Sequence, residues 1–335
     1  MDIEPGSSPA AAAARIDVPK LQLQRGLFLV ATLMYAVSHY LYTPTLPLYT
    51  QTKTADLAMI GLALSMYGLW QTVIRLPLGI ATDRVGWCKP FIIGGFALAA
   101  LGCWIMGSTD GILGLMIGRS LTGVSAGIYG LLIVVFSGLY LARESVRAST
   151  IMIAFGSLAI MTATSVTGFL NQLGGYSLSF YVAAGAALLA ILILLPAHEK
   201  RRAPHPVSLR GLGELITRRD VLLSACLCAA VQYASTATSY GFLPILASDL
   251  GAGDVALGFL LSIQVGMLFL GSVLTIFLTR RIGDWTLISL GLGVLSLGVG
   301  LAAIAPRLWV LVAAQCLIGF SWGVCYPVTS GKSIK

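Results

Sequence analysis

The sequence predicts an all-helical integral membrane protein with about ten membrane-spanning helices. Hydrophobic residues make up 57% of its 335 residues and charged residues only 10%, whereas soluble proteins are roughly 25% charged. A helix needs about 20 apolar residues to cross the hydrocarbon core. Ten segments meet this length, at about 27–49, 58–82, 90–108, 111–140, 149–172, 177–196, 221–247, 255–279, 286–305 and 308–329. Since only helices and closed barrels satisfy their backbone groups in lipid, apolar runs of this length favour helices.

The basic residues lie almost entirely on one side of the predicted bilayer. They occupy the loops that join segments 2 and 3, 4 and 5, 6 and 7, and 8 and 9, whereas the opposite loops hold only Lys53 and Arg307. By the positive-inside rule, the basic side is cytoplasmic. We therefore expect both ends of the chain in the cytoplasm and the protein in a cell membrane, either inner or plasma. Because the net charge of +8 is explained by these loops, no nucleic-acid partner is expected.

Enzymatic and cofactor chemistry is not expected. Cys226 and Cys228, the closest pair among the six cysteines, are two residues apart and so point to different faces of a helix. Residues 330–333 imitate the end of a phosphate-binding loop, but Tyr326 stands where that loop requires a glycine. We expect no catalytic residues, no cofactor and no metal.

The first segment is unusually polar for a span. It contains His39 and Tyr42 together with Pro44 and Pro47, and prolines leave carbonyl groups unpaired, which is tolerated only where protein or a water-filled cavity covers them. We expect this segment to line a cavity. With an unperturbed pKa of about 6.5, His39 is a candidate proton carrier; the alternative is a neutral histidine hydrogen-bonded inside the bundle.

The end of the second segment carries charges on one helical stripe. Arg75, Gly79 and Asp83 follow one another at intervals of four residues and so share a face. The glycine allows a neighbouring helix to approach. Charges at such an edge can hold two helix bundles together; the alternative is an ordinary turn whose charges only set the topology.

The loop that follows resembles the loop between helices 2 and 3 of the major facilitator superfamily. The pattern there is roughly G-x-x-x-D-[RK]-x-G-[RK]-[RK], and the matching residues are Gly79, Asp83, Arg84, Gly86 and Lys89. Trp87 and Cys88 occupy places where members often carry a first basic residue. The resemblance implies a transporter fold of two helix bundles and a cytoplasmic latch that includes these five residues.

Segments 4 and 5 extend the resemblance. Arg119 lies within segment 4, where an arginine is costly, and a glycine follows four residues later as in helix 4 of the superfamily. There the resemblance implies proton transfer or substrate contact; the alternative is snorkelling to the outer interface. Glu144 and Arg147 are similar to the acid and the base of the superfamily's loop 4–5, and the resemblance adds them to the latch. An exposed ion pair contributes under about 1 kcal/mol, so only a network can act as a latch.

An internal repeat divides the chain. At an offset of 197, Leu46-Pro47-Leu48 aligns with Leu243-Pro244-Ile245, and residues 82–86 align with residues 279–283. Such parallel repeats occur in transporters. We expect a tail at 1–24, a six-helix bundle at 25–196, a charged, proline-bearing linker at 197–220 and a partial bundle of four helices at 221–335.

Candidate residues for a substrate cavity come mainly from segment 7. It presents an uncharged hydrogen-bonding face, suited to hydroxyl and amide contacts, although such a face also holds neighbouring helices together. With one residue each from segments 1 and 8, the candidates are Tyr42, Gln232, Tyr233, Thr236, Tyr240 and Gln264.

These observations predict a secondary transporter that moves a small solute by alternating access. Protons are a candidate coupling ion, with His39 and Arg119 as possible carriers, and we expect a monomer. The alternatives are a non-transporting receptor or scaffold, or an inactive truncated transporter. The repeat offset places counterparts of segments 5 and 6 near 346–393, past Lys335, so about 10 of an expected 12 helices are present and we expect an incomplete chain that transports poorly. Small residues that would allow a neighbouring helix to pack closely should then have no such neighbour, namely Gly258, Gly266 and Gly319.

Overall fold

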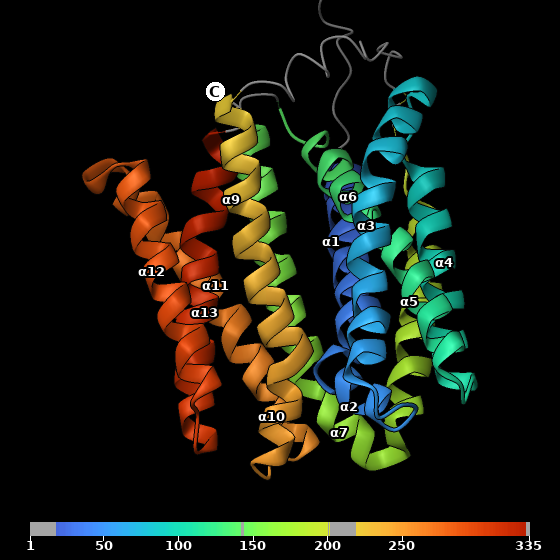
Figure 1. Cartoon of the computed structure of the whole chain (residues 1–335). Helices are drawn as coiled ribbons and strands as arrows, with labels where there is room; N and C mark the ends of the chain where they lie inside the picture. Colours follow the sequence, from blue (N-terminus) through green and yellow to red (C-terminus); the bar gives the residue numbers. More distant parts are fainter. Residues whose placement is uncertain (1–17, 142–143, 200, 202–218, 333–335) are drawn as a thin grey trace, which may run out of the picture.

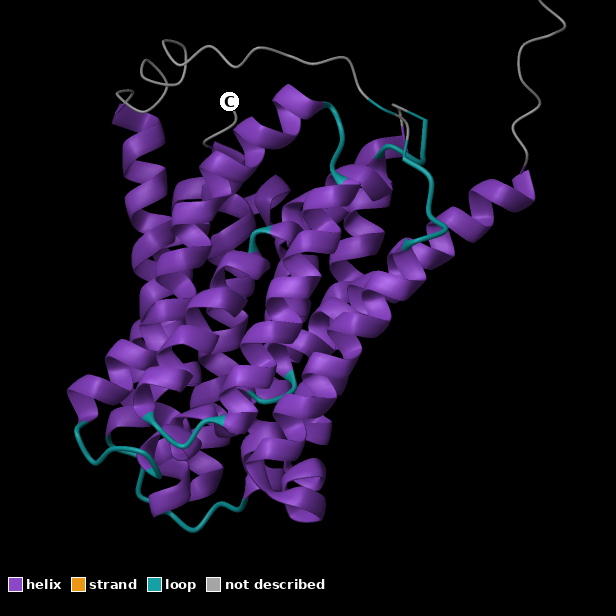
Figure 2. Cartoon of the chain, turned by 90° about the vertical axis from the view of Figure 1, so that its right-hand side faces the viewer, coloured by secondary structure: helices purple, strands orange, loops and turns teal. Residues whose placement is uncertain are grey.

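The computed structural model describes residues 18–141, 144–199, 201 and 219–332, and within these ranges all regular structure is helical (Figures 1 and 2). Nine helices of the described chain are long and apolar enough to cross a membrane. One of them, Arg147–Leu194, has 48 residues and covers the two predicted segments 149–172 and 177–196. Its helix is interrupted at Gly174 and Gly175, where Gly175 adopts a φ of 69°. The nine long helices therefore account for the ten predicted segments.

The first half of the chain begins with α1 (Val18–Tyr40), a 3-10 turn η2 (Thr43–Thr45) and the short α2 (Leu46–Gln51). Then follow α3 (Leu57–Val85), α4 (Lys89–Ser108), α5 (Ile112–Ala126), α6 (Ile128–Ser137) and α7 (Ser145–Leu194). Asp56 caps the start of α3 by accepting the Ala58 N–H at 2.8 Å. Gly86 ends α3 in the left-handed conformation that glycine adopts most readily.

The second half comprises α9 (Arg219–Thr236), a π-helical turn η4 (Ala237–Phe242) and α10 (Leu243–Asp249). The long helices α11 (Asp254–Ile282), α12 (Asp284–Ala303) and α13 (Leu308–Lys332) follow. Helices α3 and α11 have the same length of 29 residues, and both their starts and their ends lie 197 residues apart, the offset found in the sequence.

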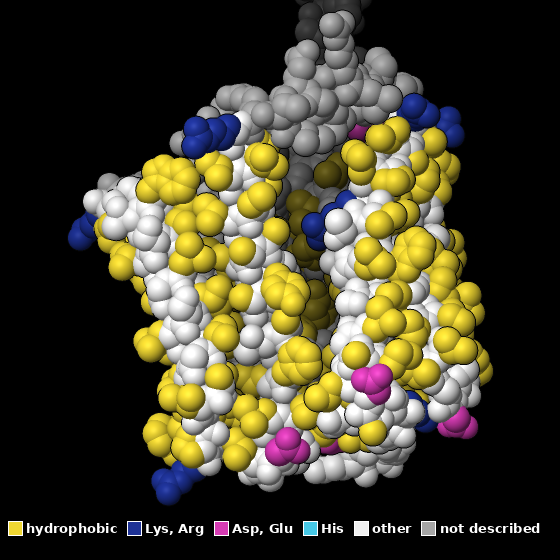
Figure 3. Space-filling view, in the orientation of Figure 1, with side chains coloured by type: hydrophobic (Ala, Val, Ile, Leu, Met, Phe, Trp, Pro, Cys, Tyr) yellow, Lys and Arg dark blue, Asp and Glu magenta, His cyan; other side chains and the backbone are white. Residues whose placement is uncertain are grey.

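The helices of each half pack chiefly against one another. In the first half α4 packs on α5 and α7, and α3 on α5; in the second half α13 packs on α11, α12 and α9. Figure 1 shows these two groups side by side, with α7 also contacting α11 across the boundary. Large apolar side chains cover much of the outer surface (Figure 3), as expected for helices in contact with lipid.

The three glycines that were expected to lack a neighbour do not lack one, so that prediction is wrong. A Cβ on Gly258 would lie 2.5 Å from the carbonyl oxygen of Thr164 in α7, and a Cβ on Gly319 would overlap with the carbonyl group of Gln264. Gly266 faces the side chain of Met161. The cause is that α7 covers the face of α11 that carries Gly258 and Gly266, while α11 covers the face of α13 that carries Gly319.

Candidate functional site

The two halves meet where α7 crosses α11. The hydroxyl groups of Thr164 and Ser165 in α7 lie 2.7 Å and 2.8 Å from the hydroxyl of Ser262 in α11. Ser262 also lies 3.1 Å from the carbonyl oxygen of Met161. These hydroxyl contacts join two long membrane-spanning helices, so they help to fix the register of α7 on α11.

A second polar contact closes the same boundary nearer the end of the molecule that carries η2 and α2. The amide nitrogen of Asn171 donates to the Asp254 carboxylate and to the Thr45 hydroxyl, both at 2.9 Å. Its amide oxygen accepts from the Ser179 hydroxyl at 2.7 Å. One side chain therefore joins η2, both arms of α7 and the start of α11.

Small residues allow this close approach. A Cβ on Gly168 in α7 would overlap with the backbone of Val255 in α11. The Cβ of any larger residue at Gly258 would meet the Thr164 carbonyl oxygen at 2.5 Å. The backbones of α7 and α11 are thus in direct contact at this level, because neither glycine interposes a side chain.

The halves separate toward the opposite end, where the predicted cytoplasmic loops lie. Of the apolar stretch of α3 only 11% is buried, and of the span 221–249 only 17%, against 33% to 56% in the other seven described spans. Figure 3 shows the surface hollowed between the two groups of helices, with a basic side chain on the wall of the hollow. The molecule is closed at one end of the boundary and open at the other.

His39 lies inside the first half with one ring nitrogen hydrogen-bonded. The ring stacks on Tyr35 with centroids 4.2 Å apart, and Nδ1 lies 3.0 Å from the Tyr35 carbonyl oxygen and 2.8 Å from the Ser38 hydroxyl. Because a carbonyl only accepts, Nδ1 carries the hydrogen in this contact. Nε2 is buried without a partner among the described residues, so a neutral ring leaves a free acceptor there.

Arg119 lies inside the bundle and does not extend to the outer interface. Its side chain is 7% exposed, its Nη2 donates to the Leu64 carbonyl oxygen at 3.3 Å, and its guanidinium lies 4.5 Å over the ring of Tyr67. No carboxylate lies within 4.0 Å of it in the described part of the chain. A buried cation held by a ring and one carbonyl is under-compensated.

Tyr67 connects these two groups. Its ring lies 6.3 Å from that of His39 and beneath Arg119. The Tyr67 hydroxyl and the Arg119 Nε are buried and, like His39 Nε2, have no partner among the described residues. Since buried polar atoms are normally hydrogen-bonded, this cluster of His39, Tyr67 and Arg119 is suited to hold water, a proton or a polar ligand.

Comparison with known proteins decides the family. The model of the Major Facilitator Superfamily matches residues 28–331, which is most of the chain. The chain belongs to the Major Facilitator Superfamily. The predicted fold class, an all-helical membrane transporter fold, is thereby confirmed.

The superfamily relatives include proteins named as transporters. The inner membrane transport protein YajR of Escherichia coli is 32% identical over 149 residues, which cover 43% of this chain and 32% of YajR. An uncharacterized transporter of Buchnera aphidicola is 32% identical over 41% of this chain and 34% of its own length. The MFS-type transporter MJ1560 of Methanocaldococcus jannaschii, also uncharacterized, is 22% identical over 87% of this chain and 77% of its own. The aligned stretch thus spans about a third of the length of YajR.

The charged residues that resemble the superfamily latch lie largely at the surface in this conformation. Asp83, Arg84 and Arg147 are exposed and Glu144 is half-buried, and no ion pair joins them among the described residues. Arg75 is exposed on α3, and no atom lies within 4 Å of a Cβ built on Gly79. The stripe therefore faces open space here, and Gly86 acts as the cap of α3.

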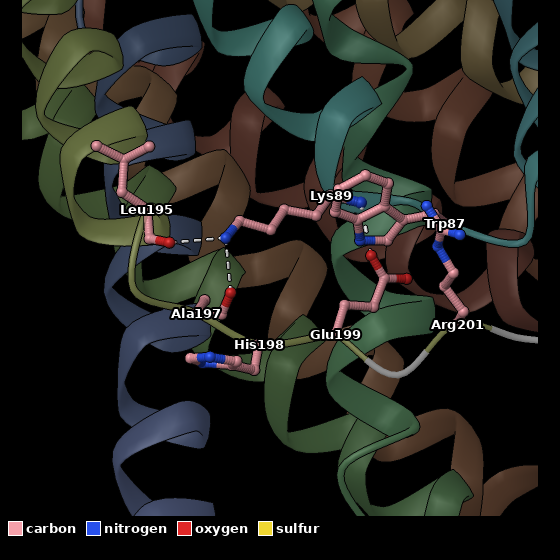
Figure 4. Close-up of a pocket in the computed structure, with 7 residues that line it drawn as sticks. All are labelled: Trp87, Lys89, Leu195, Ala197, His198, Glu199 and Arg201. Carbon is pink, nitrogen blue, oxygen red and sulfur yellow. Dashed lines mark hydrogen bonds between the residues drawn. The ribbon is translucent and has the colours of Figure 1, made fainter.

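Lys89, the last residue of the pattern, is held elsewhere. Its Nζ donates to the carbonyl oxygens of Leu195 and Ala197 at the end of α7, both at 2.7 Å (Figure 4). In return, the Glu199 carboxylate accepts the main-chain N–H groups of Cys88 and Lys89 at the start of α4. Each side chain thus caps the other helix, with the sign of charge that each helix end favours.

The predicted cavity residues divide between the core and the surface of their halves. Tyr42 is buried in the first half with its ring 4.9 Å from that of Phe180, and Gln264 is fully buried with both amide atoms unpartnered among the described residues. In the second half Tyr233 is 76% exposed and Tyr240 contacts Trp322. Gln232 and Thr236 are half-buried, and the Thr236 hydroxyl donates to the Gln232 carbonyl.

Several residues of the boundary and the cluster were not predicted from the sequence, namely Tyr67, Thr164, Ser165, Asn171, Glu199, Asp254 and Ser262. For Asn171 a signal existed, since a buried amide in an apolar segment needs a partner within the protein. Gly258 and Ser262 also belong to the internal repeat, as counterparts of Gly61 and Ser65. Glu199 gave no signal, because it lies in a run of charges that reads as an ordinary linker.

Proposed function

We propose that this protein is a secondary active transporter that moves a small polar solute by alternating access. The proposal rests chiefly on one observation: the halves touch along α7 and α11, with the Asn171–Asp254 bond at one end, and the surface between them is hollowed toward the other end (Figure 3). Such a boundary suits rocking of two units about a central site. The units are residues 25–196 and 221–335, joined by the linker 197–220, most of which lies outside the described residues.

We further propose that the open end faces the cytoplasm, so that this conformation is inward-open. The support is the charge of the loops, because the basic residues gather at that end. Single cysteines at Arg281 and at Leu57, exposed residues at opposite ends, would test this in a background without the native cysteines. We expect a membrane-impermeant maleimide to label only the Leu57 position in intact cells and only the Arg281 position in inside-out vesicles; the reverse pattern would invert the assignment.

The cluster of His39, Tyr67 and Arg119 is the proposed site of coupling or of substrate contact. Among the described residues it combines an imidazole nitrogen without a partner, a hydroxyl without a partner and a cation without a carboxylate, all within one helix bundle. An imidazole can exchange protons near neutral pH, and a guanidinium binds anionic or polar groups through several donors. The cluster therefore accommodates a proton or a polar ligand without a catalytic step.

Transport is tested with the full chain in proteoliposomes. Thermal-shift measurements over sugars, organic acids, amino acids and cationic drugs first identify a ligand, since a ligand that binds the folded state raises its melting temperature. Counterflow and pH-gradient-driven accumulation of that ligand are then measured. Accumulation above the equilibrium level establishes coupled transport, whereas binding without accumulation would favour a receptor.

A further inference from the structure

A pocket of about 220 Å³ lies within the first half, where α7 ends beside the start of α4 (Figure 4). Its lining combines residues just before and at the start of α4 with residues that follow α7: Trp87, Lys89, Leu195, Ala197, His198, Glu199 and Arg201. The volume corresponds to about seven water molecules at roughly 30 Å³ each. The pocket is distinct from the hollow between the halves and from the cluster around Arg119.

The acid of this pocket is hydrogen-bonded to the main chain. Both oxygens of Glu199 accept the Cys88 N–H at 3.0 Å, and one accepts the Lys89 N–H at 2.6 Å. Within the described ranges no lysine or arginine nitrogen lies within 4.0 Å of this carboxylate. Glu199 therefore serves the end of α4 and does not pair with the cations around it.

The cations retain unused hydrogen-bond donors. An ammonium has three donors, and Lys89 directs two of them at the carbonyl oxygens of Leu195 and Ala197. The Arg201 guanidinium carbon lies 5.3 Å from the centre of the Trp87 ring. A guanidinium has five N–H donors, so a contact with one ring leaves donors available. Two positive charges thus meet in one pocket without a carboxylate partner among the described residues.

The surroundings fit the level of lipid head groups. Lys89 begins α4 and Leu195 directly follows α7, so the pocket lies at the end of two spans on the basic side. Leu192 and Leu195 are exposed, and tryptophan is enriched at membrane interfaces. Basic pockets between membrane helices bind phospholipid head groups, and arginine recognises phosphate through its fork of donors.

We propose that this pocket binds the phosphate of an anionic phospholipid from the leaflet at the basic end. Lys89 and Arg201 contact the phosphate, Trp87 covers the head group, and the acyl chains follow the exposed leucines at the end of α7. The lipid then braces residues 197–199 and Arg201 against the loop between α3 and α4, next to the exposed Asp83 and Arg84. This site is independent of the solute and of its coupling ion.

Lipid binding by the purified full chain is the direct test. Native mass spectrometry and titration in detergent would compare phosphatidylglycerol with phosphatidylcholine for the unchanged protein, Arg201→Gln and the control Arg281→Gln, which removes an exposed arginine of the same side outside the pocket. Because one basic residue near a membrane contributes about 1 kcal/mol, we expect Arg201→Gln to weaken phosphatidylglycerol binding about fivefold. The control should bind as the unchanged protein does.

Two further measurements keep the result decisive. Equal lipid-free melting temperatures of Arg201→Gln and Arg281→Gln exclude misfolding. A brominated phosphatidylglycerol should quench less of the tryptophan fluorescence in Trp87→Phe than in the unchanged protein. Equal binding of the two lipids, or Arg201→Gln binding as tightly as the control, overturns the proposal. If soluble glycerol phosphate saturates the pocket and phosphatidylglycerol binds no more tightly than it does, the occupant is a free phosphate and the lipid proposal is wrong.

Discussion

The side-chain amide of Asn171 in α7 donates a hydrogen bond to the carboxylate of Asp254 at the first residue of α11, over 2.9 Å. The two residues belong to different halves of the chain, so the bond must break if the halves separate at this end. Thr45 and Ser179 saturate the rest of the amide. Asn171 therefore ties the two halves together at the closed end of the boundary.

Replacing Asn171 by alanine should release this end. A hydrogen bond to a charged group contributes about 1.5–3 kcal/mol, so we expect the inward-open population to fall roughly tenfold or more relative to the alternative state. Distances between spin labels at Arg84 and Arg281, both exposed at the basic end, report the shift. Gln172→Ala, the exposed neighbour, is the matched control, and an unchanged distance distribution in Asn171→Ala would contradict the proposed gate.

A larger residue at Gly258 should separate the same helices by steric force. A Cβ there meets the Thr164 carbonyl oxygen at 2.5 Å, a distance that side-chain rotation cannot relieve because the neighbour is backbone. We expect Gly258→Val to reduce both the inward-open population and the transport rate by tenfold or more. Gly293→Val serves as control, since nothing lies within 4 Å of a Cβ at that glycine. If Gly258→Val changes the inward-open population and the transport rate no more than Gly293→Val does, close contact of α7 and α11 is not needed for this state.

The spans could be predicted from the sequence because their signal is local. Apolar length places every long helix, and the repeat offset of 197 recurs in the bounds of α3 and α11. The sequence could not predict that two segments would be joined in α7. The glycine pair at 174–175 indicates a turn, but it does not determine how the two flanking helices are arranged.

The site was predictable only in part. Arg119 and His39 stand out because a charge or an imidazole in a span is costly, yet their link through Tyr67 depends on how α1, α3 and α5 pack. Asn171 and Asp254 lie 83 residues apart, and nothing in their own segments pairs them. The contact of the Lys89 ammonium with the end of α7 likewise depends on Leu195, 106 residues away.

Asp83→Asn tests the latch in the conformation where it is open. Asp83 is exposed and without an ion pair among the described residues here, so the mutation should leave this state unchanged and destabilise the state in which the latch closes. We expect slower transport and greater labelling of cysteines at the basic mouth. Asp249→Asn, an exposed acid of the second half, is the control. Unchanged transport and unchanged labelling in Asp83→Asn would remove the latch from the mechanism.

Arg119→Lys tests whether the guanidinium or only its charge is needed. Lysine keeps the positive charge, but its three donors lie at a single point and cannot reproduce the flat contact with Tyr67. If Arg119 contacts the substrate, we expect the affinity for the solute to fall at least about tenfold while the melting temperature without ligand changes little. A matched loss of stability and affinity would indicate that Arg119 serves packing alone.

His39→Gln tests the proton directly. In the native ring Nδ1 donates to the Tyr35 carbonyl and Nε2 is free to accept; a glutamine amide can keep a donor near that carbonyl but does not titrate between about pH 5 and 8. Transport that depends on protonation of His39 should therefore lose its pH dependence in this range while binding of the solute persists. His205→Gln, which changes one of the two histidines of the predicted linker 197–220, should keep the full profile. If His39→Gln keeps it as well, the histidine is a structural residue and the coupling proton is carried by another group.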